Sequence, residues 1–290
     1  MTVSTLTLTP GATTPGVGAY AEPYPFLLGT HQPGWLTSAG VPLFVSDRRL
    51  RHYRRLPRAR APWALDSGGF TELATFGTWA HGPTPAEYVA RARRYGDEIG
   101  HLAWIAPQDW MCEPVILAGT GLTAAEHQRR TVANFVQLRD LAPDLPIVPV
   151  VQGWTPGDYL RCVDRYCTAG IDLTTEPLVG VGTVCRRQGT RDAGRILHAL
   201  HTAGVRRLHG FGFKTLGLIE YGDLLASADS MAWSFEARRR GQPLPGCTRH
   251  RNCANCLRYA LAWRERLIAT LTQRSPQLTL FAGARLGGAA

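Results

Sequence analysis

The stretch PWALDSGGFTEL, residues 62–73, contains an apolar run that ends abruptly at an acid, a hydroxyl and two glycines. The apolar run predicts a buried strand, and Asp66 and Ser67 stand where that strand ends. The pair Gly68 and Gly69 allows the backbone to curl against a flat group, because glycine has no Cβ. We therefore expect this segment to present a carboxylate at the end of a strand, beside backbone that a ligand can approach closely.

Short apolar runs of this kind alternate with amphipathic segments along the chain. Two of the amphipathic segments open on a predicted capping box, Thr84 with Glu87 and Thr123 with Glu126. Eight strands with helical crossovers predict an α/β fold and favour a (β/α)8 TIM-type barrel over an open doubly wound sheet. The predicted strands are residues 25–30, 42–46, 63–67, 102–109, 146–153, 177–182, 207–213 and 227–233.

The chain has 290 residues, 44% of them hydrophobic, which is enough for one large core. Residues 1–22, rich in Thr, Gly and Pro, are expected to form a disordered leader. The barrel domain is expected over residues 23–270, followed by a flexible tail over 271–290. No window approaches the ~18 apolar residues of a membrane span, so we expect no membrane partner and a cytoplasmic location.

Polar residues and glycines follow six of the predicted strands at their carboxyl ends, the face on which a barrel builds its active site. An acid after a single strand is more often a helix N-cap or a turn former. Several such residues on one rim favour a functional pocket instead. The set comprises Asp66, Asp109, Gln152, the Gly180/Gly182 pair, His209 and Asp229.

The formal net charge is +10, and Lys214 is the only lysine. Charge of this size favours a polyanionic partner. Seven arginines fall within residues 46–60, and so dense a run of like charge favours nucleic acid over the alternative of a solvated charged face. The expected nucleic-acid contacts are Arg48, Arg49, Arg51, Arg54, Arg55, Arg58, Arg60 and Arg239.

Four soft metal ligands are crowded into one short segment near the C-terminus. Cys247, His250, Cys253 and Cys256 follow one another with two residues between each pair. This spacing favours zinc over its alternatives, which are merely buried or reactive cysteines and an iron–sulfur cluster. Four protein ligands leave no open position for catalysis, so we expect residues 245–258 to form a small structural zinc knuckle after the last strand.

The motifs together resemble those of a known enzyme superfamily. In chain order they are LDSGGF (65–70), PQDWMC (107–112), VVQGW (150–154), LVGVG (178–182), HGFG (209–212) and SADSMAW (227–233). This series is similar to that of the tRNA-guanine transglycosylases. It resembles most the DNA-acting branch, the deazapurine-in-DNA (DpdA-type) transglycosylases and their short queuine tRNA-ribosyltransferase-like relatives. The resemblance spans about residues 25–265 and also implies a structural zinc with three cysteines and a histidine.

The resemblance implies a role for each motif. Asp229 takes the position of the nucleophile that holds the sugar covalently, and Asp66 that of the acid/base for the departing and incoming purines. Asp109 and Gln152 take the positions that hydrogen-bond the purine edge. Backbone amides at Gly180 or Gly182 would approach the base, and the sequence does not distinguish these two. Further base or sugar contacts are expected at Ser67, Gly68, Gly69, Gly153 and His209.

The expected function is exchange of guanine in nucleic acid for a 7-deazaguanine derivative, such as 7-cyano-7-deazaguanine, with DNA favoured over tRNA. No redox or nucleotide cofactor is expected besides structural Zn²⁺. Three alternatives stay open: a tRNA-acting transglycosylase, a hydrolytic base-excision glycosylase and a non-catalytic nucleic-acid-binding relative. Analysis of nucleosides from DNA and tRNA, with and without the gene, would separate them.

The C-terminal segment carries one more motif. QLTLF, Gln277 to Phe281, resembles the pentapeptide by which bacterial proteins bind the sliding clamp, although a strand or arm docked on the barrel is the alternative. We predict that residues 275–290 are flexible and bind a bacterial sliding clamp. Binding assays should show that Leu280→Ala/Phe281→Ala loses clamp affinity, and equal binding by the variant and the full-length protein would contradict this.

Overall fold

The structure is a computed structural model that describes residues 25–185, 187 and 190–283, and side chains as far as residue 273. Its eight strands form one sheet of order β4-β3-β2-β1-β8-β7-β6-β5, in which every neighbouring pair is parallel. The strands are β1 Phe26–Thr30, β2 Leu43–Ser46, β3 Trp63–Asp66, β4 Leu102–Ile105, β5 Val150–Val151, β6 Val179–Val181, β7 Leu208–Gly210 and β8 Ser227–Ser230.

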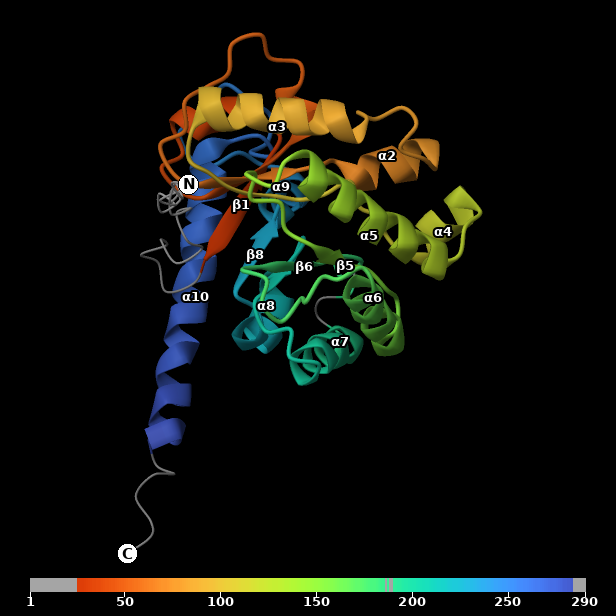
Figure 1. Ribbon diagram of the computed structural model, residues 1–290. Helices are drawn as coiled ribbons and strands as arrows, with labels where there is room; N and C mark the ends of the chain where they lie inside the picture. Colours follow the sequence, from red (N-terminus) through yellow and green to blue (C-terminus); the bar gives the residue numbers. More distant parts are fainter. Residues whose placement is uncertain (1–24, 186, 188–189, 284–290) are drawn as a thin grey trace, which may run out of the picture.

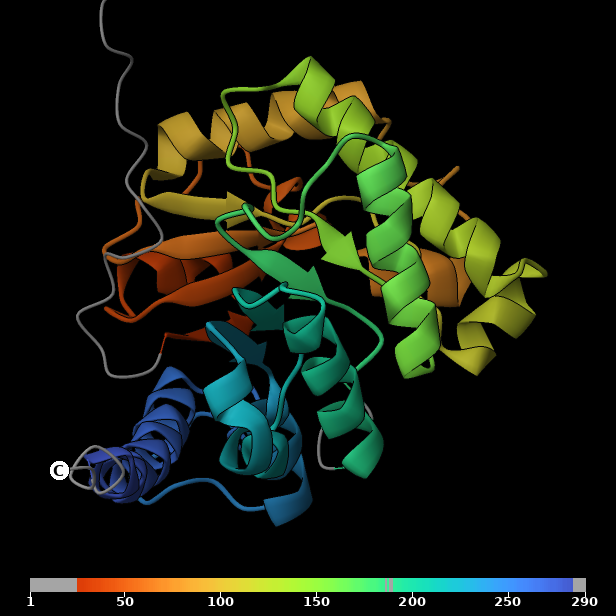
Figure 2. The ribbon, with the colours of Figure 1, turned by 60° about the horizontal axis from the view of Figure 1, so that its bottom comes forward.

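The sheet is curled and TIM-like, with the first strand hydrogen-bonded to the last (Figures 1 and 2). At the other side of the curl, an isolated parallel bridge joins Ile105 at the end of β4 to Ile147, just before β5. Each of the eight predicted strands contains one of these strands, so the predicted α/β fold with a parallel eight-stranded sheet is confirmed.

Helices surround the curled sheet (Figure 2). The predicted capping box at Thr84 is present, with Thr84 N donating to Glu87 Oε2 at 2.8 Å and Glu87 N donating to Thr84 Oγ1 at 3.3 Å. The box predicted at Thr123 is only half formed, because the Glu126 carboxylate pairs with arginines instead of returning to the cap. The helices are α1 Asp47–Leu50, α2 Gly69–Phe76, α3 Pro85–Ile99, α4 Pro114–Thr120, α5 Ala124–Leu141, α6 Pro156–Thr168, α7 Arg191–Thr202, α8 Thr215–Tyr221, α9 Ala232–Arg240 and α10 Leu257–Gly283, with 3-10 turns at Pro33–Thr37 and Gly222–Leu224.

The first two crossovers depart from a regular β/α repeat. A 3-10 turn follows β1 and a single turn of helix, α1, follows β2. The C-terminal helix α10 covers β1 in their place (Figure 1). Arg264 donates from Nη2 to the carbonyl of Phe26 at 3.1 Å, and the Phe26 and Trp263 rings lie 6.0 Å apart. The chain thus returns to its own first strand to complete the helical layer.

Alternation along the strands separates two cores. Residues such as Phe26, Leu28 and Trp63 point outward into the large core beneath the helices. Leu27, Ala64, Trp104 and their neighbours point inward and form a smaller core inside the curl. Because successive side chains of a strand point to opposite faces, the strand-end residues two positions beyond the inward ones also face the inside. Asp66, two residues after Ala64, is one of them.

The C-terminal part of the chain is helical farther than predicted. Residues 271–290 were expected to form a flexible tail, whereas the backbone is helical up to Gly283, through Gln277 to Phe281. The side chains of the sliding-clamp motif and residues 284–290 lie outside the described part, so clamp binding stays a prediction. The leader expected over residues 1–22 lies outside it as well. Within the described residues, none of the helices combines the length and apolar character needed to cross a bilayer.

Candidate active site

A cavity of about 540 Å³ opens at the carboxyl ends of the strands. Its walls come from segments far apart in the sequence. Five of the residues predicted for the site line it together with Gly69, and each lies in the carboxyl-terminal part of a different strand or just past it: Asp66, Asp109, Gln152, Gly182 and Asp229. The topology therefore brings the predicted acids and the predicted amide into one space.

Asp229 is held by two groups from the neighbouring strand β7 and the loop after it. The backbone N of Gly212 donates to Asp229 Oδ1 at 3.0 Å, and His209 Nε2 lies 3.3 Å from the same oxygen. The other ring nitrogen of His209 lies 2.8 Å from Ser227 Oγ, which fixes the plane of the imidazole. No described residue hydrogen-bonds Asp229 Oδ2. One carboxylate oxygen is thus positioned while the other remains available in the cavity.

Asp66 ends β3, and its carboxylate folds back on the glycine pair. The backbone N of Gly68 donates to Asp66 Oδ1 at 3.0 Å, and Gly68 has a φ of 81°, a left-handed conformation that glycine adopts without strain. Burial raises the pKa of Asp66, the hydrogen bond from Gly68 opposes this rise, and the negative charge of Asp229 adds to it. Asp66 is therefore biased toward the protonated form.

Asp109 and Gln152 form one hydrogen-bonded unit. Gln152 Nε2 donates to Asp109 Oδ2 at 2.5 Å, and Gln152 Oε1 accepts from the Thr183 hydroxyl at 2.6 Å. The Thr183 oxygen in turn accepts from the backbone N of Cys112 at 2.8 Å. This order of donors fixes which end of the Gln152 amide is oxygen, so the Gln152 amide keeps one N–H that points to no protein acceptor among the described residues.

Gly182 and Gly69 leave room for this unit. A Cβ on Gly182 would collide with the Gln152 amide, and one on Gly69 would lie 3.0 Å from Asp109 Oδ1. Burial raises the pKa of Asp109 to about 7, and the charge of Asp66 adds to this rise. Asp109 therefore changes its protonation state near neutral pH.

Aromatic rings form the floor of the cavity. Phe211 and Phe44 line it, with their ring centroids 5.9 Å apart, and Trp104 and His209 pack beside them. A Cβ on Gly180 would lie 2.5 Å from the Phe211 ring. Gly180 thus makes space for the Phe211 ring, whereas Gly182 makes space for the Gln152 amide. Gly182 lines the cavity and Gly180 does not, and the approach of either backbone amide to a base stays a prediction.

Four of the other predicted contacts are placed near the cavity without lining it. Ser67 and Gly68 form the turn beneath Asp66, and His209 acts on the site through Asp229. Gly153 packs against the start of α6, where a Cβ would lie 2.8 Å from the backbone N of Tyr159. These positions shape the site, and their predicted contacts with substrate stay predictions.

Sequence reasoning missed Thr183, although its hydroxyl orients the Gln152 amide. Thr183 has a φ of 57°, a left-handed conformation that is rare for a β-branched residue. Glu113 is also buried at the wall, with its Oε2 3.3 Å from the Thr183 hydroxyl. The sequence position of Thr183 could have identified it, because Thr183 directly follows Gly182 at the end of a predicted strand. A hydroxyl at this position faces the same cavity as Gln152.

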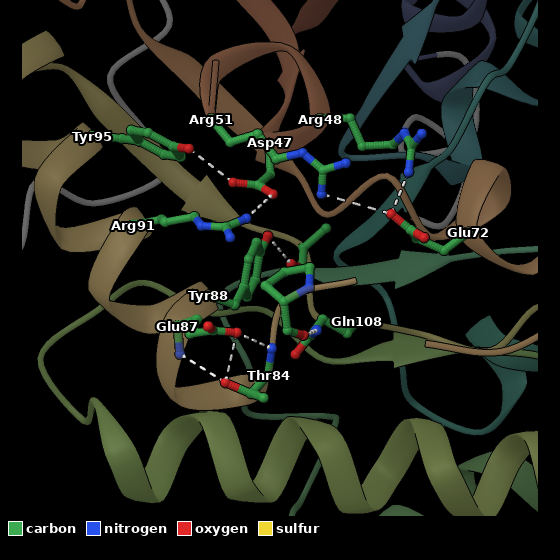
Figure 3. Close-up of polar contacts among 12 residues, drawn as sticks. Asp47, Arg48, Arg51, Glu72, Thr84, Glu87, Tyr88, Arg91, Tyr95 and Gln108 are labelled. Carbon is green, nitrogen blue, oxygen red and sulfur yellow. Dashed lines mark hydrogen bonds and ion pairs between the residues drawn. The ribbon is translucent and has the colours of Figure 1, made fainter. Parts of the chain in front are cut away.

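The arginine-rich segment divides into an inward-facing and an exposed group. Arg48 and Arg51 turn inward and pair with the buried Glu72, so their charge is partly neutralised within the protein (Figure 3). Asp47 is likewise enclosed by Arg91 at 3.0 Å and by the hydroxyl of Tyr95 at 2.8 Å. Exposed side chains remain available for an anionic partner at Arg49, Arg54, Arg55, Arg58 and Arg60.

A second groove adjoins the cavity and shares part of its wall, including Phe70 and Met231. It contains Arg239, the predicted contact farthest along the chain, whose guanidinium lies 6.0 Å from the Phe235 ring. Phe235 is 62% exposed and Leu216 is 71% exposed, so this groove presents apolar side chains beside cations.

The four predicted metal ligands converge. One ligand atom from each of Cys247, His250, Cys253 and Cys256 lies within 4.8 Å of the others. The two outer sulfurs are 3.9 Å apart, close to the ~3.8 Å expected for thiolates about 2.3 Å from a tetrahedral zinc ion. The backbone N of Leu244 points at Cys253 Sγ at 3.2 Å. The donor set and its geometry therefore fit a four-coordinate metal ion.

Removing one thiol should remove the metal. We expect Cys253→Ser to lose one equivalent of zinc and much of its thermal stability, because Cys253 is buried where the knuckle joins α10. Metal analysis and thermal denaturation would measure both effects, with Cys167→Ser, at an exposed position of α6, as the control. The prediction would be contradicted if the wild-type protein contained no metal and Cys253→Ser melted at the same temperature as the wild type.

The comparison with known proteins agrees with this site. No curated protein matches the sequence. Residues 24–287 match the family described as "DpdA: DeoxyPurine in DNA protein A", and this match covers both the cavity and the metal-ligand cluster. The chain belongs to the DpdA family of DeoxyPurine in DNA proteins.

Proposed function

We propose that the protein is a transglycosylase that exchanges guanine in DNA for a 7-deazaguanine derivative, such as 7-cyano-7-deazaguanine. The observation that carries this proposal is the placement of Asp66 and Asp229 in one cavity with the Asp109–Gln152 unit. Two carboxylates that face one cavity suit a double displacement at a sugar carbon. The family match supports deoxypurine chemistry in DNA.

In the first half of the reaction, Asp229 Oδ2 attacks C1′ of the target nucleotide. The bond from C1′ to the purine nitrogen breaks, its electrons go to the purine, and Asp66 supplies the proton that lets guanine leave. In the second half, Asp66 takes a proton from the incoming deazapurine. That base attacks C1′ and releases Asp229, and two inversions restore the original configuration.

The Asp109–Gln152 unit provides the guanine selectivity in this proposal. Ionised Asp109 accepts from the ring N–H and the amino group, and the remaining N–H of Gln152 donates to the carbonyl oxygen. Adenine presents a donor where guanine presents that carbonyl, and would leave buried polar groups unpaired. The aromatic floor of Phe44 and Phe211 gives the flat base an apolar surface.

Two structural points complete the proposal. We take the curled sheet to be a (β/α)8 barrel closed between β4 and the segment before β5, supported by the Ile105–Ile147 bridge. The Cys3His cluster would hold Zn²⁺ as a structural ion that fixes residues 245–258 against the start of α10. We keep the cytoplasmic location that the sequence led us to expect.

The decisive experiment is exchange of labelled guanine into polymer. Purified protein is incubated with labelled guanine and either duplex DNA, single-stranded DNA or tRNA, and label is counted in each. Label in DNA supports the proposal, whereas label in tRNA alone assigns the protein to tRNA. Release of guanine without incorporation would make it a hydrolytic glycosylase, and neither event would favour a non-catalytic binder.

The protonation of Asp109 predicts a pH dependence of base binding. Its pKa is raised to about 7, so lowering the pH through 7 protonates the carboxylate that must accept hydrogen bonds. The affinity for free guanine, measured by calorimetry, should fall as the pH drops from about 8 to about 6. Asp109→Asn should bind guanine weakly at every pH and show no such slope, and an equal slope in the variant would contradict the assignment.

A further inference from the structure

A polar depression of about 550 Å³, distinct from the groove that contains Arg239, lies beside the catalytic cavity. The two share His31, Arg49 and His52. The depression is also walled by Arg238, from α9, and by Asn255, which stands between two of the metal ligands. Segments from the start and the end of the fold thus meet around one small volume.

The lining of this depression consists mainly of hydrogen-bond donors and contains no carboxylate among the described residues. It is formed by His31, Gln32, Pro33, Arg49, His52, Tyr53, Arg238 and Asn255. Two permanent cations therefore face one space, and within the described part of the chain no carboxylate pairs with Arg49 or Arg238. This contrasts with the neighbouring Arg48 and Arg51, which pair with Glu72.

The guanidinium groups of Arg49 and Arg238 both lie close enough to His31 to affect its protonation. Partial burial lowers the pKa of His31, and the positive charges of Arg49 and Arg238 lower it further. The cations are thus close enough to disfavour a third positive charge beside them. A bound anion would relieve this repulsion, and the fork geometry of arginine suits the tetrahedral oxygens of a phosphate.

We propose that this depression is a phosphodiester-binding site that holds the DNA backbone next to the nucleotide whose base enters the catalytic cavity. This inference rests on the proposed function. Because His31, Arg49 and His52 line both spaces, a phosphate bound here adjoins the target nucleotide. An enzyme that acts on a base flipped out of the DNA helix must hold the neighbouring backbone in place. Phosphate contacts do this, because they fix the register of the strand without reading its sequence.

The test combines a protein variant with a chemical change in the DNA. Arg49→Gln/Arg238→Gln removes two charges and keeps polar, shorter side chains at both positions. Arg129→Gln/Arg195→Gln removes the same charge from exposed positions on α5 and α7 and serves as the matched control. Each protein is titrated with an oligonucleotide series in which one phosphate at a time, on either side of the target guanine, is a neutral methylphosphonate.

The wild type and the control should lose about tenfold in affinity at one methylphosphonate position next to the target. The Arg49→Gln/Arg238→Gln variant should bind normal DNA about tenfold more weakly and show no further loss at that position. Its plot of log affinity against log salt should be shallower by about 0.7 to 0.9 per lost phosphate contact. Its melting temperature should match the wild type.

A flat methylphosphonate scan in a wild type that binds DNA and incorporates guanine would overturn the inference and leave the proposed function standing. A variant that remains sensitive at the same position would overturn it as well. If inorganic phosphate protects the wild type from thermal unfolding while the scan is flat, the site takes a free anion and the backbone assignment is wrong. A wild type that binds no nucleic acid would instead contradict the proposed function itself.

Discussion

Asp229→Asn is expected to abolish base exchange while leaving the fold and DNA binding intact. The amide cannot form the ester-like bond to C1′ on which the double displacement depends. The fold should persist, because the amide oxygen can still accept from Gly212 N and face His209. The variant also removes a negative charge from a largely buried site, so no unpaired charge is created.

Three measurements check this result. Incorporation of labelled guanine should fall to background, thermal denaturation should match the wild type, and a covalent protein–DNA adduct should be trapped on denaturing gels with the wild type alone. Asp223→Asn, in the exposed turn before β8, is the matched control and should retain full activity. Turnover by Asp229→Asn at a rate like that of the wild type would eliminate the proposed mechanism.

The fold and the main acids could be predicted because both depend on local patterns. An apolar run of a few residues followed by an acid identifies a strand and its end, and parallel strands bring their carboxyl ends to one rim. Asp66, Asp109, Gln152 and Asp229 were expected in this way to share one rim, and they line one cavity. The convergence of the three cysteines and the histidine could be predicted because these four residues lie within ten positions and their spacing does not depend on the rest of the fold.

The missed features depend on which residues meet across the fold. Arg48 and Arg51 have the same sequence signal as Arg49, and only the position of Glu72 on α2 turns them inward. Thr183 joins the site through a left-handed backbone that its residue type disfavours. The replacement of early crossover helices by α10 likewise required knowing where the last helix packs, which no local pattern contains.

Asp66→Asn is expected to slow the chemistry by about 10²–10⁴-fold, the usual contribution of a general acid/base. An amide can neither protonate the departing guanine nor deprotonate the incoming base. The variant should still bind DNA, because the substituted side chain keeps an amide oxygen that can accept from Gly68 N. Single-turnover release of guanine isolates the acid step, and unchanged rates there would contradict the role.

The pH dependence distinguishes loss of an acid from loss of structure. The pKa of Asp66 is raised by burial and by the charge of Asp229, so the folded protein holds this proton more tightly than the unfolded chain. As the pH rises from the ordinary pKa of an aspartate through the raised pKa of Asp66 in the folded protein, ionisation of Asp66 lowers the stability. The same ionisation removes the proton that Asp66 would donate to the departing guanine. The wild-type release rate should fall with rising pH, whereas Asp66→Asn should be slow and flat. Because the variant cannot ionise there, it should be at least as stable as the wild type at neutral pH, and a large drop in its melting temperature would show that Asp66 is structural instead.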